Sequence, residues 1–245
     1  MMPSPVHPQL SPPRNFTEAE QLTWADIISI QRPRRERQMH PLFMQGIAKL
    51  DMDVDRIPNL EKINRKLKSL TGWTGVLVEG LEDGASFYSM LRDRQFPIGN
   101  FIRDRGDLNY TPAPDIVHDL YGHIPFFADA DYADFCQRFG ALAARAAHIP
   151  EHLVQYERVF WFTIEFGLIE TINGRRIFGA GIASSIGECE YALSNKPQVV
   201  PFDLEVIRRQ DFRIDQMQTK LFLLNDTRQL YGCLGELEQA VRRPQ

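Results

Sequence analysis

The sequence has few cysteines and lacks any long apolar run. Its 245 residues include three cysteines, which are widely spaced and form no Cys-x-x-Cys motif: Cys136, Cys189 and Cys233. Such usage favours the reducing cytoplasm and thiols that serve only as core residues. No stretch approaches the roughly 18 consecutive apolar residues of a membrane helix, and the N-terminus lacks a signal peptide's apolar core. We therefore expect a cytoplasmic protein with no membrane partner.

Excess positive charge is also missing. The formal net charge is -4 and no long basic run occurs, so a nucleic acid is not an expected partner. With 43% hydrophobic and 24% charged residues, the composition is that of an ordinary soluble globular protein. Residues 1–16 carry five prolines and few residues that could pack, which predicts a disordered tail. Residues 17–245 show no repeat and no second linker, which indicates a single domain.

The periodic segments predict a mainly helical fold with a few short strands. Thr17 to Glu20 forms a capping box that opens a helix, and Gly72 is a plausible C-terminal stop for a second helix. Further helices are expected from about 129 to 147 and from near Asp226 onward. Asn173-Gly174 lies between two apolar runs and predicts a hairpin with a type I′ turn.

Glu165 is an acid inside an apolar run, residues 160–168, that has the composition of a core segment. A lone buried carboxylate costs several kcal/mol unless it is paired or bound to a metal. His118 and His123, upstream, are the candidate partners. Two histidines and one carboxylate form the facial triad that holds non-haem iron(II) and leaves positions open. The sequence therefore predicts that these three residues are metal ligands and catalytic.

The spacing of the two histidines constrains the local structure. Five residues on an α-helix rotate them about 140° apart, at roughly 100° per residue. They can share a metal only if that helix ends between them, and Gly122 and Pro125 are suitable breakers. Asp115 lies one turn before His118 and could orient an imidazole from behind.

Other interpretations of these residues exist. The histidines could be ordinary core or surface residues, and zinc accepts the same three ligands, although the segment is not His-Glu-x-x-His. The Gly-Ala-Gly-Ile-Ala-Ser run at 179–184 is similar to a dinucleotide fingerprint, but its third glycine is replaced by Ser184 and no βαβ pattern surrounds it.

Several segments, in the right order, resemble the pterin-dependent aromatic amino acid hydroxylases: 97–103, 110–115, 118–125, 160–168 and 178–188. The similarity runs from about 71 to 224 and is closest to the catalytic domain of short bacterial members. It implies a basket-like, mainly helical domain that uses iron(II), a tetrahydropterin and O2 to hydroxylate the ring of an aromatic amino acid. Phenylalanine, converted to tyrosine, is the expected substrate. Tryptophan hydroxylation, meta-hydroxylation of phenylalanine, and a non-catalytic metal-binding or ligand-sensing protein stay open as alternatives. No long C-terminal coiled-coil segment is seen, so a monomer is expected.

The resemblance also assigns the substrate side. Arg103 matches the arginine that clamps the substrate carboxylate, a role that suits a planar guanidinium. Its alternative is a structural salt bridge, with Asp115 as the candidate partner. Thr111 and Ser184 match polar contacts near that carboxylate or the iron histidine. Five residues match the wall of the pocket that surrounds the substrate's aromatic ring in the family: Tyr110, Pro114, Trp161, Phe166 and Gly181.

The pterin side is matched less closely. Gly80, Leu81 and Phe87 fit the family's pterin loop, with Phe87 as the stacking ring. Asp119 stands where the family usually has glutamate. In the same loop Glu82 and Gly84 replace an apolar residue and a serine. Three further matches lie around the site: Asp115, Phe160 in place of a tyrosine, and Glu188, whose role the sequence does not reveal.

Overall fold

Helices dominate the structure, as the sequence predicts. The computed structural model describes residues 8–80, 82–108 and 114–242. Its α-helices are α1 (Glu18–Gln38), α2 (Pro41–Leu50), α3 (Leu60–Thr71), α4 (Gly84–Arg92), α5 (Ala130–Ala146), α6 (Pro150–Phe160), α7 (Ala180–Ala183), α8 (Ile186–Ala192), α9 (Leu204–Ile207), α10 (Thr227–Gly232) and α11 (Leu234–Val241). In the part of the chain described, none of these helices has the length and apolar character that a membrane span requires.

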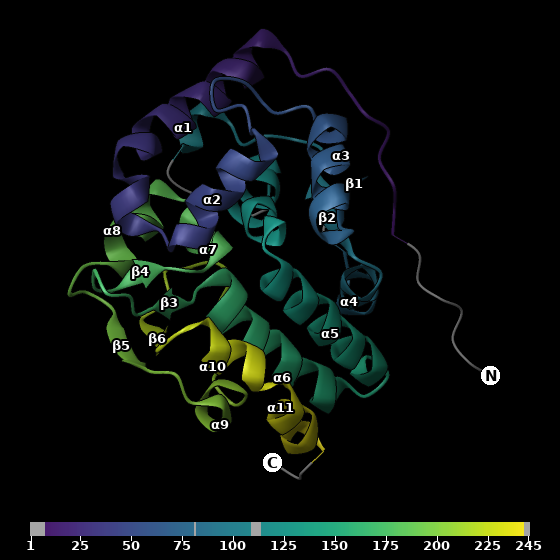
Figure 1. Cartoon of the computed structure of the whole chain (residues 1–245), viewed down its shortest axis with the longest axis vertical. Helices are drawn as coiled ribbons and strands as arrows, with labels where there is room; N and C mark the ends of the chain where they lie inside the picture. Colours follow the sequence, from purple (N-terminus) through teal and green to yellow (C-terminus); the bar gives the residue numbers. More distant parts are fainter. Residues whose placement is uncertain (1–7, 81, 109–113, 243–245) are drawn as a thin grey trace.

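Two small sheets lie on opposite sides of the helical body (Figure 1). Strands β1 (Thr74–Val78) and β2 (Gln95–Gly99) form a parallel pair. The second sheet has the order β4-β3-β6-β5, where β3 (Leu168–Ile169) runs antiparallel to β4 (Arg176–Ile177) and parallel to β6 (Lys220–Leu224). Strand β5 (Gln198–Pro201) is parallel to β6. The sheets are too small to form a layer of their own, so helices supply most of the core.

The predicted helix signals at the first and third helices are confirmed. Thr17 accepts a hydrogen bond from the Glu20 backbone N–H, and the Glu20 carboxylate accepts one from the Thr17 N–H at 2.7 Å. Helix α3 ends at Gly72, whose φ of +79° is readily adopted only by glycine. Both boundaries follow from local chemistry that the sequence shows directly.

Residues 8–16 differ from the expected disordered tail. Leu10 pairs with Val78, and the Ser11 N–H donates to the Leu77 carbonyl at 3.0 Å. The Glu79 N–H donates to the Gln9 carbonyl at 2.9 Å. The physical reason is that β1 is an edge strand with unpaired backbone groups, which this segment satisfies. Residues 1–7 of the predicted tail lie outside the described residues.

The β3–β4 hairpin is confirmed, but its predicted turn type is wrong. A type I′ turn needs positive φ at both central residues, and here only Gly174 has one, at +85°. The turn is instead centred on Ile172 and Asn173, because Thr171 and Gly174 exchange two backbone hydrogen bonds of 3.2 and 2.9 Å. The glycine therefore follows the turn.

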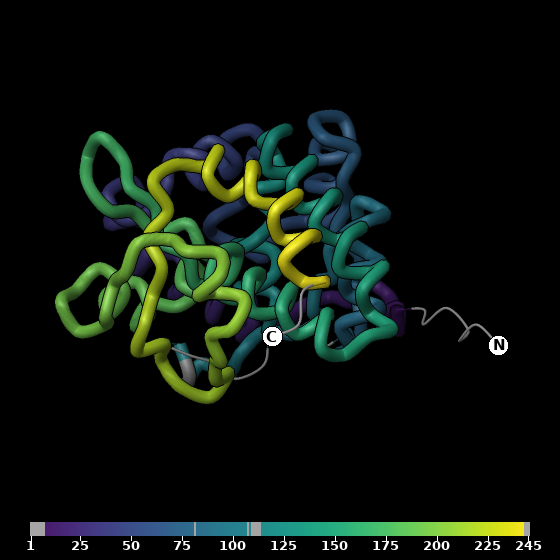
Figure 2. Tube along the Cα trace, turned by 90° about the horizontal axis from the view of Figure 1, so that it is seen from below, coloured from purple at the N-terminus to yellow at the C-terminus, as the bar shows by residue number. Residues whose placement is uncertain are grey.

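The C-terminal helical segment is broken in two. Asp226 caps α10 as predicted, but the chain turns at Cys233 before α11 begins. Gly232, a poor helix former, ends the first piece. Apolar residues at helical spacing are buried on both pieces: Leu230, Leu234, Leu237 and Val241. Both helices pack across α5, as the yellow segment of Figure 2 shows.

Three segments that are distant in sequence meet at the centre. Helix η2 (Val117–His123) packs against α7, and α7 also packs against η4 (Trp161–Glu165). Helix η2 continues into the 3-10 helix η3 (Ile124–Ala128), and a further 3-10 turn, η1 (Arg105–Asp107), precedes it. This packing brings together the predicted ligand segments and the 178–188 segment.

Candidate active site

The two histidines lie on a π-helix, so the expected helix break between them is wrong. Helix η2 spans Val117–His123 as one continuous π-helical segment. In a π-helix the hydrogen bond runs from residue i to i+5, so His118 and His123 fall on one face without any break. Gly122 serves packing rather than capping, since a Cβ there would lie 2.9 Å from the Ala180 carbonyl oxygen. Glu165 ends a second π-helix, η4.

The three predicted ligands converge. The nearest donor atoms are His123 Nε2 and Glu165 Oε1 at 3.0 Å, and His118 Nε2 lies 3.5 Å from Glu165 Oε2. The two Nε2 atoms are 3.2 Å apart, and all three donors lie within 4.8 Å of one another. In the described part of the chain no fourth histidine, cysteine or acid joins this group. Three ligands from one side leave the remaining metal positions open.

The charge states suit a divalent metal. Burial lowers the pKa of His118 to about 4, so this imidazole is neutral at neutral pH and keeps its lone pair. Burial alone would raise the pKa of Glu165, but His123, His118 and the Gly181 N–H outweigh it and hold that pKa below its usual value. Two imidazoles and one carboxylate therefore fit iron(II), and by ligand type alone they also fit zinc.

Ser184 sets the orientation of His118. Its hydroxyl donates to the Gly181 carbonyl at 3.1 Å and lies 3.1 Å from His118 Nδ1. Because that hydroxyl has a single proton, it accepts from the Nδ1–H of the imidazole. The Nε2 lone pair is then free to face the metal position. Ser184 thus lies where the resemblance places a polar contact to the iron histidine.

Arg103 and Asp115 form a buried bidentate pair. The Arg103 Nε and Nη2 donate to Asp115 Oδ2 and Oδ1 at 2.9 and 2.8 Å, and both side chains are at most 2% exposed. Asp115 Oδ1 also accepts the His118 backbone N–H at 3.1 Å. It therefore orients the main chain of His118 and not the imidazole. Arg103 Nη1 donates to the Ser184 carbonyl at 3.3 Å. Of the five guanidinium N–H groups, these bonds use three, and the salt bridge to Asp115 that the sequence offered as an alternative role is present.

A cavity of about 440 Å³ opens above the three ligands. Phe87 meets Phe160 edge to face at 5.3 Å, and Phe160 stacks over His123 at 6.5 Å. Asp119 accepts the Gly99 N–H at 2.7 Å, and burial raises its pKa well above the usual value. Besides the ligands, the predicted residues that line the cavity are Gly80, Phe87, Pro114, Asp119, Phe160 and Trp161.

Other predicted residues lie behind the cavity wall. The Phe166 ring packs against Trp161 in a tilted arrangement, with the ring centroids 4.6 Å apart. A Cβ at Gly181 would lie 3.0 Å from the Glu165 carbonyl and from the Phe166 ring, so this position needs glycine for close packing. Glu188 is buried on α8, and burial raises its pKa to about 7. Three predicted residues lie outside the described residues: Leu81, Tyr110 and Thr111.

Two residues near the site escaped prediction. Arg35 is buried, donates to the Ala183 carbonyl and, at 3.1 Å, to Cys189 Sγ, and so braces the segment that carries Ser184. Its helical spacing from Trp24 on α1 is the signal that could have revealed it. Glu157 lines the cavity. It precedes Phe160 by three residues, which places both on one helical face.

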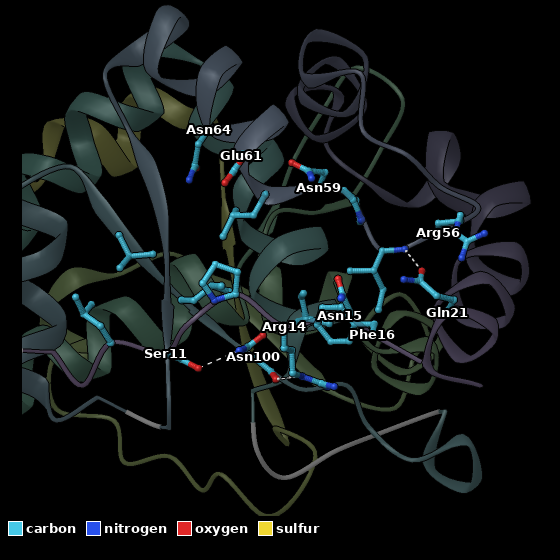
Figure 3. A pocket seen from close by; sticks show the side chains of 18 residues that line it. Ser11, Arg14, Asn15, Phe16, Gln21, Arg56, Asn59, Glu61, Asn64 and Asn100 are labelled. Atoms are coloured by element: carbon cyan, nitrogen blue, oxygen red, sulfur yellow. Dashed lines mark hydrogen bonds between the residues drawn. The ribbon is translucent and has the colours of Figure 1, made fainter. Parts of the chain in front are cut away.

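A second cavity, of about 750 Å³, lies between residues 10–16 and the start of α3 (Figure 3). Several of its polar groups are bonded within the protein. Asn100 Nδ2 donates to Ser11 Oγ at 2.9 Å, and Arg14 Nε donates to the Asn100 carbonyl at 2.9 Å. The Gln21 side chain accepts the Ile57 N–H at 2.8 Å. None of the three metal-ligand residues lines it, so the smaller cavity is the candidate site.

Comparisons with known proteins agree with this assignment. The family of biopterin-dependent aromatic amino acid hydroxylases matches residues 7–244. Phenylalanine-4-hydroxylase of Caulobacter vibrioides is 39% identical over 216 residues, which are 88% of this chain and 73% of that protein. Phenylalanine hydroxylase of Chromobacterium violaceum with iron(III) and 7,8-dihydrobiopterin superposes with a TM-score of 0.87 at 35% identity, covering 94% and 85% of the two chains. The same enzyme with iron and phenylalanine gives 0.85 at 33% identity, with the same coverage.

Proposed function

We propose that this chain, which belongs to the biopterin-dependent aromatic amino acid hydroxylases, converts phenylalanine to tyrosine with iron(II), a tetrahydropterin and O2. The observation that carries the proposal is the convergence of His118, His123 and Glu165 beneath a cavity whose lining includes several aromatic side chains. Homologous structures with iron and 7,8-dihydrobiopterin, or with iron and phenylalanine, support the choice of cofactor and substrate.

The side chains around the ligands have distinct tasks. His118, His123 and Glu165 would hold the iron, and Ser184 keeps the His118 lone pair directed at it. When bound, the iron and the tetrahydropterin supply the chemistry that activates oxygen. Phe160 and Trp161 exclude water from the cavity. Arg103 holds the amino acid carboxylate with its two remaining donors, and Asp115 fixes its guanidinium.

The pterin is assigned to the part of the cavity formed by the loop before α4. Phe87 offers a ring for stacking, and Gly80 keeps the loop open where the cofactor lies. Asp119, held by Gly99, would face the pterin as a hydrogen-bonding group. Leu81 is proposed to complete this loop on the resemblance alone.

We also propose a monomer that works in the cytoplasm. The three thiols are buried and unpaired with one another, which supports a reducing compartment. The net charge of -4 gives no support to a nucleic acid partner. Light scattering of the purified protein at two concentrations tests the monomer: a single mass near 28.3 kDa is expected, and a stable dimer would contradict it.

The function is tested by loading the protein anaerobically with iron(II) and then adding a tetrahydropterin and oxygen. Phenylalanine, tyrosine and tryptophan are supplied in parallel, and products are separated against authentic para and meta standards with mass detection. We expect para-tyrosine from phenylalanine, formed only when both iron and pterin are present. A meta product or hydroxytryptophan as the main product would replace the proposed specificity, and an absence of any pterin oxidation would contradict the activity.

A further inference from the structure

The cavity above the iron ligands holds more acid than metal binding requires. Glu82 and Glu157 line it together with Asp119 and Glu165. Glu165 is assigned to the metal, and Asp119 accepts a hydrogen bond from Gly99. The proposed reaction gives no task to the other two carboxylates. They come from different elements, since Glu82 lies in the loop before α4 and Glu157 on α6.

These two acids lie at the end of the cavity away from the metal. Glu157 precedes Glu165 by eight residues on the continuous α6–η4 segment, or about 12 Å along the axis at 1.5 Å per residue. The chain approaches Glu157 two residues after Glu82, because a Cβ at Gly84, the first residue of α4, would lie only 2.9 Å from Glu157 Oε1. Glycine at 84 therefore makes room for the Glu157 carboxylate. Both Glu82 and Gly84 depart from the family pattern of an apolar residue and a serine.

Both carboxylates can accept further hydrogen bonds. The Glu82 carboxylate accepts from the Ser86 hydroxyl and, at 3.3 Å, from the Gln9 N–H, which uses two of its roughly four lone-pair positions. Among the residues that the structure describes, no hydrogen bond or ion pair reaches the Glu157 carboxylate. Burial raises the pKa of Glu157, as expected for an acid short of donors. A ligand with hydroxyl groups would supply donors to both.

Acidic side chains dominate the charge in the described lining of the cavity. Its described lining residues include four carboxylates and no lysine or arginine. Iron(II), at the opposite end of the cavity, would offset the negative charge of Glu165 and at most one further negative charge. A phosphate or carboxylate placed beside Glu82 and Glu157 would meet like charge in a partly buried site, where repulsion is weakly screened.

We propose that Glu82 and Glu157 select the pterin by its side chain, binding an uncharged side chain with hydroxyl groups and rejecting an anionic one. The inference rests on the proposed function and deepens it, since it names the class of pterin that the site takes. The hydroxyls donate to the two carboxylates, while the pterin ring lies between them and the iron. The 7,8-dihydrobiopterin in the homologous Chromobacterium violaceum structure has an uncharged hydroxylated side chain.

The test compares two pterins that differ by one phosphate: 7,8-dihydroneopterin and its monophosphate. Equilibrium binding to the anaerobic, iron(II)-loaded protein is followed by tryptophan fluorescence, to which Trp161 in the cavity wall can respond. We expect the uncharged pterin to bind at least about tenfold more tightly, given two nearby like charges. The double variant Glu82→Gln, Glu157→Gln should reduce that ratio about tenfold, chiefly by tighter binding of the phosphate form.

Controls separate this inference from the function on which it rests. Glu151→Gln removes an exposed acid on the same helix, outside the cavity, and should leave the ratio unchanged. If the wild type binds both pterins equally, or the double variant keeps the full ratio, the selection is wrong while the function stands. If neither pterin binds to folded, iron-loaded wild type, the proposed function fails and the selection fails with it.

Discussion

Removing the Ser184 hydroxyl should weaken iron binding without touching a ligand. In the wild type this hydroxyl accepts the His118 Nδ1–H and donates to the Gly181 carbonyl, both at 3.1 Å. Ser184→Ala leaves the imidazole free to rotate or to change tautomer, so the Nε2 lone pair is no longer fixed. Loss of such a partner behind a metal ligand typically costs 10–100-fold in metal affinity, or about 1.4–2.7 kcal/mol. The protein itself should lose only about 1 kcal/mol of stability.

The assay is an anaerobic titration of metal-free protein with iron(II) against a coloured chelator. Ser184→Thr keeps the hydroxyl and should recover most of the affinity. Ser194→Ala is the matched control, because its hydroxyl donates to the Tyr191 carbonyl at 2.7 Å and does not line the cavity. Wild-type iron affinity in folded Ser184→Ala would refute the idea that this hydroxyl sets the His118 imidazole.

Three further predictions follow from the same geometry. Arg103→Ala should lower the free energy of unfolding by about 3–5 kcal/mol, because it leaves Asp115 buried and unpaired, and should raise the KM for phenylalanine about tenfold or more. Denaturant unfolding and initial rates check this, and an unchanged KM would contradict the carboxylate clamp. Phe160→Tyr should increase tyrosine formed per tetrahydropterin oxidised, because it adds a hydrogen-bond donor to the cavity; an equal ratio would mean that the position only packs. Burial raises the pKa of Glu188 to about 7 from 4.5, so its ionisation costs stability as pH rises from 4.5 through 7, on the order of 3 kcal/mol in total. Glu188→Gln should remove this part of the decline, measured as the change in unfolding free energy between pH 5 and pH 8, and an identical decline in both proteins would contradict it.

The sequence predicts the fold class and the convergence of His118, His123 and Glu165 well, because these depend on strong local signals. A carboxylate in an apolar run needs a partner wherever the chain folds, so Glu165 could be linked to His118 and His123 without a structure. The capping box at Thr17 and the glycine stop at Gly72 are likewise complete within a few residues.

The errors arise where distant segments decide the local structure. The π-helix that aligns the two histidines is stabilised by packing against α7, and periodicity based on the α-helix could only suggest a break at Gly122. Residues 8–16 have a composition typical of disorder, but they are ordered by the unpaired edge of β1. Arg35 is buried against the segment that carries Ser184; its helical spacing from Trp24 indicates the buried face of α1, but not which distant carbonyl it contacts.

The central claim is that one iron, held by His118, His123 and Glu165, carries the hydroxylation. The direct measurement is the iron content and the tyrosine produced by wild type and three single variants, His118→Ala, His123→Ala and Glu165→Gln, after identical anaerobic loading and removal of free metal. Circular dichroism confirms that each variant is folded. We predict close to one iron per chain in the wild type, and variants that lose iron and tyrosine formation together. A folded variant that keeps both its iron and its activity would contradict the account.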